Sequence, residues 1–310
     1  MLRLGVIAVF ALISAACTPR AQQGPACAAI EIGATIALGP GRVARGANLF
    51  APEERQGGGG DVSAFSIDVH EVTNQQYAAF VDSTHYVTLA ERLGPDGAPL
   101  GAGVFDRGSG QWRLDPHANW RHPEGAGTSI RGRERYPVVD VAYEDALAYA
   151  RWAGRRLPNE NEWEFAARGA LPAPANPRAE AYASDGAPRA NTWQGLFPFT
   201  DTGADGFTGS APVACFPPNA SGLYDMIGNV WEWTSDVFVG PQVRDIARAD
   251  EAPMRVLKGG SNLCASNFCS RFRSGSRQPG DESLGMSHVG FRTASDLNPP
   301  TPSPTDATQR

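Results

Sequence analysis

The 310-residue sequence has little of several features that mark whole classes of protein. It has no run rich in lysine and arginine and a formal net charge of -6, which argues against a general nucleic-acid-binding protein. It has only five histidines, none in a helical pair four residues apart, which argues against a histidine-rich iron site. It also lacks internal repeats and any linker between Ala29 and Asp296, so we expect one domain over residues 29–296.

Long apolar runs are absent too, except at the N-terminus. Arg3 precedes the apolar stretch Leu4–Ile13, and small residues follow it, a pattern typical of a signal peptide over residues 1–17. The stretch is too short to span a membrane. Ala15-Ala16-Cys17 also resembles a bacterial lipoprotein cleavage site. We therefore expect an exported bacterial protein, either periplasmic or attached to the membrane through a lipidated Cys17, with plain secretion as the alternative.

Short elements broken by turns are expected, because the sequence has 35 glycines and 25 prolines. Alternating apolar residues in IEIGATIAL and FSIDV predict strands. Capping patterns predict helices that start after Thr73, near Tyr143 and after Asn159. We expect their buried faces to contain Tyr77, Phe80, Val81, Ala146, Leu147, Ala150, Trp152, Trp163 and Phe165. The sequence thus predicts an irregular α+β domain after a linker (18–28) and before a disordered tail (297–310).

Five cysteines are present, and Cys17 belongs to the signal sequence. Export to an oxidising compartment allows disulfides among the other four, which can pair in three ways. The simplest assignment joins Cys27 to Cys215 and Cys264 to Cys269.

The segment GGSNLCASNFCSRFR, Gly259–Arg273, gives Cys264 and Cys269 further interpretations. Thiolates are soft ligands that select Cu(I) or zinc. Zinc normally needs four ligands and no other cysteine or histidine lies nearby, whereas two thiolates suit Cu(I). Arg271 and Arg273 would lower the thiol pKa values if they face the pair. From the spacing alone, a local disulfide is favoured.

Longer motifs then occur in a fixed order: EVTNQQYAAFV, NWRHPEG, RLPNENEWEFAARG, NTWQGLFPFTDTGADGFTGSAPV, GLYDMIGNVWEWTSD, RVLKGGS and VGFRTA. Together they resemble the formylglycine-generating enzyme family, also called sulfatase-modifying factors, over roughly Ala29–Ala294. The resemblance implies a C-type-lectin-like α+β fold that is loop-rich, has little regular secondary structure and binds calcium.

The resemblance also implies an activity. Cys264 and Cys269 match the copper(I)-binding pair of that family, which favours copper over a disulfide. Ser261 lies where the family borders its oxygen pocket, and Trp231 where it lines the site. The implied reaction converts a cysteine of a sulfatase-type polypeptide, in a Cys-x-Pro-x-Arg context, to Cα-formylglycine with molecular oxygen. Cys269 would lie next to the substrate and Cys264 deeper, and we expect a monomer.

Two positions depart from the family pattern. Ala265 stands where a histidine usually follows the first cysteine, and Phe268 where a tyrosine usually precedes the second. Neither departure removes a metal ligand, so copper binding is expected to survive while substrate recognition or rate changes. The alternative function is a non-catalytic lectin-like binding module with a Cys264–Cys269 disulfide. An iron-dependent oxidoreductase of the same superfamily ranks last, because histidines are few.

Calcium binding is the last implication of the resemblance. Calcium takes about six to eight oxygen ligands from carboxylates, amides and main-chain carbonyls. The implied ligands are Asn191, the Thr192 carbonyl, Asp205 and the Phe207 carbonyl in a first site, and Asp225, the Gly228 and Val230 carbonyls and Glu232 in a second, with Glu71 near an ion site. Without the resemblance, the Asp205 segment is an ordinary polar turn and Glu232 a buried carboxylate paired with an arginine.

Overall fold

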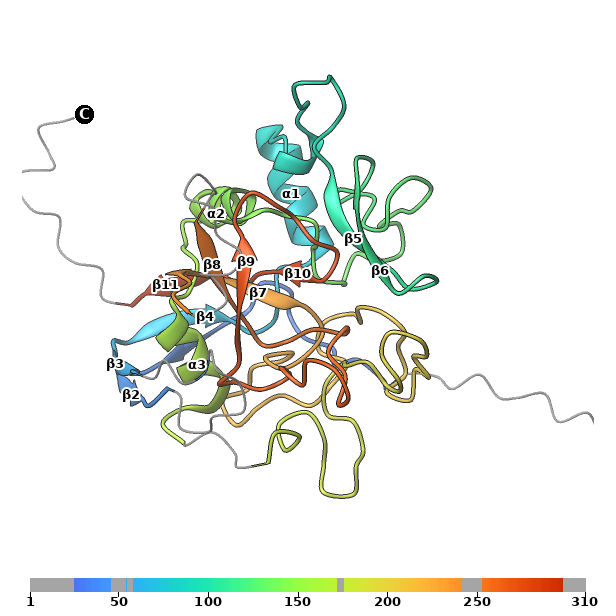
Figure 1. The fold of residues 1–310 in the computed structure, drawn as a ribbon. Coiled ribbons are helices and arrows are strands. Elements are labelled where there is room, and N and C mark those ends of the chain that lie inside the picture. Colours follow the sequence, from blue (N-terminus) through green and yellow to red (C-terminus); the bar gives the residue numbers. More distant parts are fainter. Residues whose placement is uncertain (1–24, 46–53, 55–57, 172–175, 241–252, 298–310) are drawn as a thin grey trace, which may run out of the picture.

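The computed structural model describes residues 25–45, 54, 58–171, 176–240 and 253–297 (Figure 1). The predicted signal peptide with Cys17, and the tail beyond Leu297, lie outside these residues. The helices are α1 (Asn74–Thr84), α2 (Tyr143–Trp152), α3 (Glu160–Arg168) and the 3₁₀ helix η2 (Leu89–Glu91). The strands are β1 (Thr35–Leu38), β2 (Gly41–Val43), β3 (Gly60–Val62), β4 (Phe65–Asp68), β5 (Ala102–Asp106), β6 (Gln111–Asp115), β7 (Trp231–Val237), β8 (Met254–Lys258), β9 (Arg277–Asp281), β10 (Val289–Gly290) and β11 (Ala294–Asp296).

The described strands form small separate sheets, which confirms the predicted loop-rich α+β class. In the largest sheet, β7 lies between antiparallel β8 and parallel β10, and β9 pairs with the other edge of β8. In a second sheet, β4 pairs with β1 and β11, so strands from the two ends of the domain lie side by side. The ribbon of β5 and β6 projects from one side of the body in Figure 1.

The helix boundaries follow from their caps, as the sequence predicts. Thr73 and Gln76 form a capping box at the start of α1, with reciprocal bonds of 3.3 and 3.0 Å. Asn159 accepts a bond from the Glu162 N–H at 2.8 Å at the start of α3. Gly169, with φ of 65°, ends that helix in a conformation that few other residues adopt.

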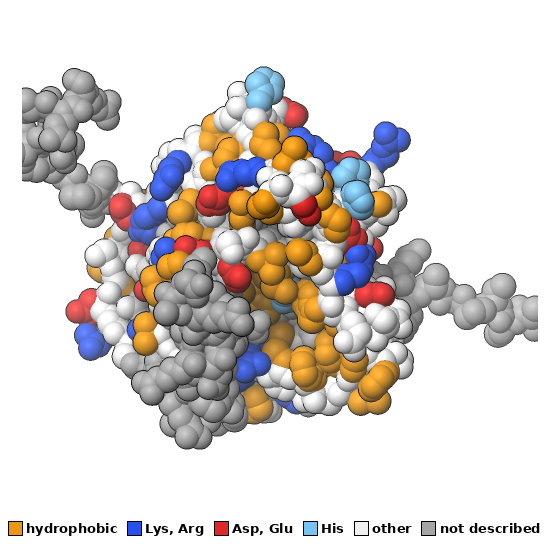
Figure 2. All heavy atoms as spheres, turned by 45° about the horizontal axis from the view of Figure 1, so that its top comes forward, with side chains coloured by type: hydrophobic (Ala, Val, Ile, Leu, Met, Phe, Trp, Pro, Cys, Tyr) orange, Lys and Arg blue, Asp and Glu red, His pale blue; other side chains and the backbone are white. Residues whose placement is uncertain are grey.

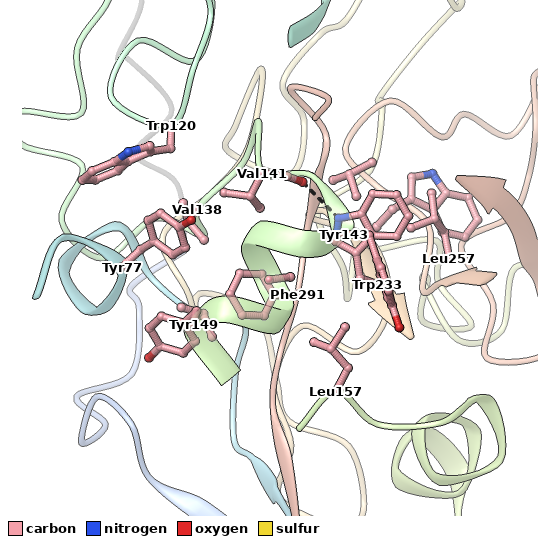
Figure 3. Packing of buried hydrophobic residues seen from close by; sticks show 14 of the residues in the cluster. Tyr77, Trp120, Val138, Val141, Tyr143, Tyr149, Leu157, Trp233, Leu257 and Phe291 are labelled. Atoms are coloured by element: carbon pink, nitrogen blue, oxygen red, sulfur yellow. Dashed lines mark hydrogen bonds between the residues drawn. The ribbon is translucent and has the colours of Figure 1, made fainter. Parts of the chain in front are cut away.

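The main core is aromatic, as Figure 3 shows. The Tyr77 ring packs 5.2 Å from Trp120 and 5.8 Å from Tyr149, measured between ring centroids. The Trp233 indole N–H donates a 3.0 Å hydrogen bond to the Val141 carbonyl, so this large ring is buried with its polar atom satisfied.

Three predicted core residues are not fully buried. Trp152 is 45% exposed, and Leu147 and Phe165 are only half-buried. Helix α2 buries the face that carries Tyr143, Ala146 and Ala150, three to four residues apart, and Trp152 lies off this face at the end of the helix.

One predicted disulfide is present: Cys27 is bonded to Cys215. The neighbouring Ala28 N–H donates a 2.7 Å hydrogen bond to the Ala214 carbonyl. The last residues of the predicted linker are therefore fixed to the domain. No helix within the described ranges is long and apolar enough to cross a membrane.

Candidate active site

The segment that carries Cys264 and Cys269 begins with two glycines directly after β8. Gly259 and Gly260 have φ of 96° and 81°, and a Cβ atom on Gly260 would lie 2.8 Å from the Arg271 carbonyl oxygen. Other residues would be strained at these angles and would push the strand end away from Arg271. The glycines therefore let the segment fold tightly back over the end of the sheet.

The cysteine pair itself consists of free thiols. The two Sγ atoms are 3.0 Å apart, so the local disulfide favoured by spacing alone is not formed. The Cys264 carbonyl accepts a 3.1 Å bond from the Trp193 N–H, and a tight turn joins Ala265 to Phe268. Cys269 has φ of 71°, in the left-handed region that side chains rarely adopt, so the surrounding fold must hold it there.

The two thiols differ in acidity. Burial, followed by the neighbouring Cys269, raises the pKa of the Cys264 thiol well above its ordinary value. The hydrogen bond from Cys264 lowers the pKa of Cys269 to about 6, against the opposing effect of burial, and Arg271 lowers it further. At neutral pH the pair is therefore a buried thiol that donates a hydrogen bond to a half-buried thiolate.

Of the two arginines predicted to lower the thiol pKa values, Arg271 lowers that of both cysteines. Arg271 lines the same cavity as the cysteines. Arg273 is turned elsewhere, where its Nη1 donates a 2.8 Å bond to Glu54 Oε2 in a buried ion pair. The chain bends at Arg273 and enters a turn, so the two side chains do not share one direction.

The cavity beside the cysteines has a volume of about 220 Å³. It brings together the residues expected from the sequence, since Ser261 and Trp231 line it with both cysteines. The full lining is Trp112, Phe197, Trp231, Ser261, Leu263, Cys264, Phe268, Cys269, Arg271, Gln278, Met286 and His288. Several of these were not predicted, because β6 is distant from the cysteines in sequence and no motif marks Gln278 of β9 or His288 before β10.

Ala265 and Phe268, the two departures from the family pattern, lie in different surroundings. Ala265 is fully buried against a small apolar cluster with Trp193 and Leu263. Phe268 stacks on Phe197 with ring centroids 4.4 Å apart and remains 53% exposed at the cavity edge. Figure 2 shows that apolar side chains gather over the centre of one face of the molecule, with charges of both signs around them. At the cavity itself, exposed Trp112 and Phe268 form an apolar edge that suits the binding of a polypeptide.

The first implied calcium site has an unpaired ligand atom. Asn191 Oδ1 is buried without a hydrogen-bond partner among the described residues. Asp205 accepts bonds from the N–H groups of Thr192 at 3.1 Å and Phe207 at 3.0 Å, and burial raises its pKa to about 6. A buried carboxylate and an unpaired amide oxygen in one loop cluster fit the donor set of an oxygen-binding cation.

The second implied site differs, because Glu232 is already satisfied. Both of its carboxylate oxygens accept bonds from Arg292, at 2.7 and 2.8 Å, and the Trp163 indole N–H donates a third bond. This is the arginine-paired alternative for Glu232, with two protein donors on Oε2 and one on Oε1. Burial, Asp225 and Glu232 raise the pKa of nearby Glu71 well above its ordinary value, and Glu71 Oε2 is unpaired within the described chain.

Asn229 forms hydrogen bonds with residues of both implied calcium sites and of the cysteine segment, and no sequence motif predicted this. Its side chain bonds Asn191 at 3.0 Å and Glu71 at 3.1 Å. Its main-chain carbonyl accepts a 2.8 Å bond from the Asn262 side chain, two residues before Cys264. Its position within GNVWEW offered no local signal of this role, because its partners come from four separate segments.

Across the described residues, no group of three or more His, Cys, Asp or Glu side chains is arranged to hold a metal ion. A cation at the Asn191 cluster would depend on amide and main-chain oxygens as well as Asp205. At the cysteine pair, a metal would depend on two sulfurs, an arrangement that suits a soft ion of low coordination number.

Comparisons with known proteins identify the family of this chain. A family model described as "Sulfatase-modifying factor enzyme 1-like domain" matches residues 20–297. The chain is 43% identical over 291 residues to the formylglycine-generating enzyme of Mycobacterium tuberculosis, covering 84% of this chain and 97% of that protein. It is 44% identical over 252 residues to the formylglycine-generating enzyme of Thermomonospora curvata, covering 76% and 83%.

Among solved structures, PvdO from Pseudomonas aeruginosa matches 87% of this chain and 100% of its own, with a TM-score of 0.54 and 24% identity. That likeness supports the fold alone. Together with the family model and the two relatives, it confirms the fold expected from the motifs. The chain belongs to the sulfatase-modifying factor family, which includes the formylglycine-generating enzymes.

Proposed function

We propose that this protein is a copper-dependent formylglycine-generating oxidase that acts on sulfatase-type polypeptides. The cysteine pair carries the proposal. Two free cysteines, 3.0 Å apart, lie at the wall of a cavity that also contains Trp231 and Ser261. The relatives named formylglycine-generating enzyme, at 43 and 44% identity, support it.

The cysteine pair fits copper(I) as its metal. A thiolate is available at Cys269, and Cys264 can lose its proton when a cation replaces the hydrogen bond between the sulfurs. When bound, copper(I) would supply the one-electron chemistry that molecular oxygen requires. Arg271 stabilises negative charge at Cys269, and the indole of Trp231 forms an apolar wall that excludes water.

The electron balance of the reaction requires a further reactant. Loss of two hydrogens converts the substrate –CH₂SH group to a thioaldehyde, and hydrolysis then gives the aldehyde and hydrogen sulfide. This oxidation releases two electrons, whereas reduction of molecular oxygen to two waters consumes four. The remaining two electrons must come from an external reductant, such as a small thiol.

Calcium is proposed at the Asn191 cluster, where Asn191 Oδ1 is unpaired and Asp205 is buried. Bound calcium would favour the charged form of Asp205 and fix the loop that continues to Trp193 and the Cys264 carbonyl. Calcium would therefore stabilise the cysteine segment through the hydrogen bond between the Trp193 N–H and the Cys264 carbonyl. At the second implied site, Glu232 is paired with Arg292, so calcium there would have to share the carboxylate with that arginine.

The proposed setting is the bacterial periplasm, or the membrane through a lipidated Cys17. A sulfatase that crosses the inner membrane unfolded would present its cysteine segment to the enzyme before it folds. The Cys27–Cys215 disulfide supports an oxidising compartment.

The test is an anaerobic titration of the reduced mature protein with Cu(I) against a competing chelator, beside a Cys269→Ser variant. One tightly bound copper per chain, lost in the variant, is expected. The loaded protein should then convert the cysteine of a Cys-x-Pro-x-Arg peptide to an aldehyde in the presence of oxygen and a thiol. Failure of the wild type to bind copper under competition would sink the proposal and leave a non-catalytic binding module.

A further inference from the structure

One polar side chain of the cysteine cavity, His288, has no role in the mechanism above. Its main-chain carbonyl accepts a 2.8 Å hydrogen bond from the Trp231 N–H, directly before β10 pairs with β7. Its imidazole lines the same cavity as the two cysteines. The backbone is thus fixed to the strand that carries Trp231, and the residue forms part of the cavity wall that it shares with the cysteines.

The His288 imidazole is buried but incompletely bonded. Only 6% of the residue is exposed, and Nδ1 has no hydrogen-bond partner in the described part of the chain. The ring is held by contact with Trp112, with centroids 4.8 Å apart. Burial lowers its pKa to about 3, so at neutral pH the ring is uncharged and has one donor and one acceptor nitrogen.

His70 in the same chain shows what a structural histidine looks like. It is as deeply buried, but Nδ1 lies 2.6 Å from the Glu71 carbonyl oxygen and Nε2 accepts a bond from the Gly33 N–H at 3.4 Å. Burying a polar atom without a partner destabilises a fold, so the unpaired Nδ1 of the cavity-lining His288 can accept a partner that enters the cavity.

The two sulfurs and the Ser261 hydroxyl of this cavity are engaged within the protein. The Cys264 and Cys269 sulfurs contact each other, and the Ser261 hydroxyl accepts a 3.2 Å bond from the Leu263 N–H. Phe268 has no hydroxyl where relatives of the family usually carry a tyrosine. An uncharged imidazole suits an uncharged partner, and a peptide main chain offers both an N–H and a C=O at each residue.

We propose that His288 is a substrate-positioning residue, whose imidazole hydrogen-bonds the main chain of the bound polypeptide beside the reacting cysteine. This inference rests on the proposed function. In this role, His288 would supply a hydrogen bond to the substrate that Phe268, which has no hydroxyl, cannot make. It also predicts recognition of the peptide backbone, so the contribution of His288 should be the same for peptides of different flanking sequence.

The experiment separates binding from turnover. The reduced, metal-free mature protein is titrated calorimetrically with a Ser-x-Pro-x-Arg peptide, which can bind but cannot react. His288→Leu should weaken peptide binding about tenfold, the effect of losing one hydrogen bond. His288→Asn and His288→Gln, which keep a donor and an acceptor, should recover much of it. On the loaded enzyme, His288→Leu should raise KM for the cysteine peptide and leave kcat and copper affinity near wild type.

His70→Leu is the matched control. It should lower the thermal midpoint, because it leaves the Gly33 N–H unpaired, and it should leave peptide affinity unchanged. His288→Leu removes an unpaired atom and should not lower the midpoint. If the wild type converts the peptide and His288→Leu binds it equally well, the positioning role is wrong and the oxidase stands. If the wild type neither binds nor converts the peptide, the proposed function itself is wrong.

Discussion

Cys27 and Cys215 are 188 residues apart and form a disulfide, whereas Cys264 and Cys269 are five apart and remain free. Sequence distance alone would favour a bond within the close pair. The distant pair joins the start of the domain to a loop that the Ala28–Ala214 bond also holds. The close pair has a left-handed residue at Cys269 and a 3.0 Å contact between a thiol and a thiolate. The fold therefore holds one pair as a disulfide and keeps the other pair as free, reactive sulfurs.

Replacing one sulfur of the close pair should have the largest effect. Cys269→Ser removes the thiolate, so kcat for a Cys-x-Pro-x-Arg peptide should fall at least on the order of 10³-fold. Aldehyde formation is measured by mass spectrometry. The double variant Cys27→Ser/Cys215→Ser is the control and should retain activity. Activity of Cys269→Ser within tenfold of the wild type would contradict a catalytic role for the close pair.

Removing the distant pair should affect stability instead. Cys27→Ser/Cys215→Ser should lower the free energy of unfolding by about 2–5 kcal/mol, because the disulfide restricts the unfolded chain. Urea unfolding without reductant measures the change. Wild-type protein unfolded with excess reductant should match the double variant. If the variant fails to bind copper under conditions in which the wild type binds it, the two cysteine pairs are coupled and do not act separately.

The smallest expected effect concerns the acidity of the thiolate. Because the Cys269 pKa is lowered to about 6, alkylation of the reduced, metal-free protein by iodoacetamide should rise with pH through a midpoint near 6. Above the midpoint the sulfur is the reactive thiolate, and below it the unreactive thiol. Arg271→Leu should move the midpoint upward, towards an ordinary thiol, and slow alkylation at pH 7 several-fold. Arg273→Leu, which breaks the pair with Glu54, should leave the midpoint unchanged.

Much of the scaffold was predictable from local sequence. The caps at Thr73 and Asn159 fixed two helices, because capping depends on residues three positions apart. The motif resemblance placed Ser261, Trp231 and the cysteines at one site, and the structure brings them together.

The remaining site residues were not predictable, because distant segments supply them. Trp112 reaches the cavity from β6, and His288 from the segment before β10. Glu232 is paired with an arginine 60 positions away, so no local pattern could decide between an ion pair and a metal ligand. The direction of Arg273 depended on Glu54, more than 200 residues earlier in the chain.

The left-handed backbone at Cys269 and Ser270, with φ of 71° and 48°, limits how this site could be transplanted. A designer who copied two cysteines with a four-residue spacer onto a helix or a strand would point the sulfurs in other directions. The two glycines after β8, and the loops that hold the Cys264 carbonyl, would have to be copied with them. A transplanted site would therefore need the whole loop and the residues that hold it, and the two cysteines alone would not be enough.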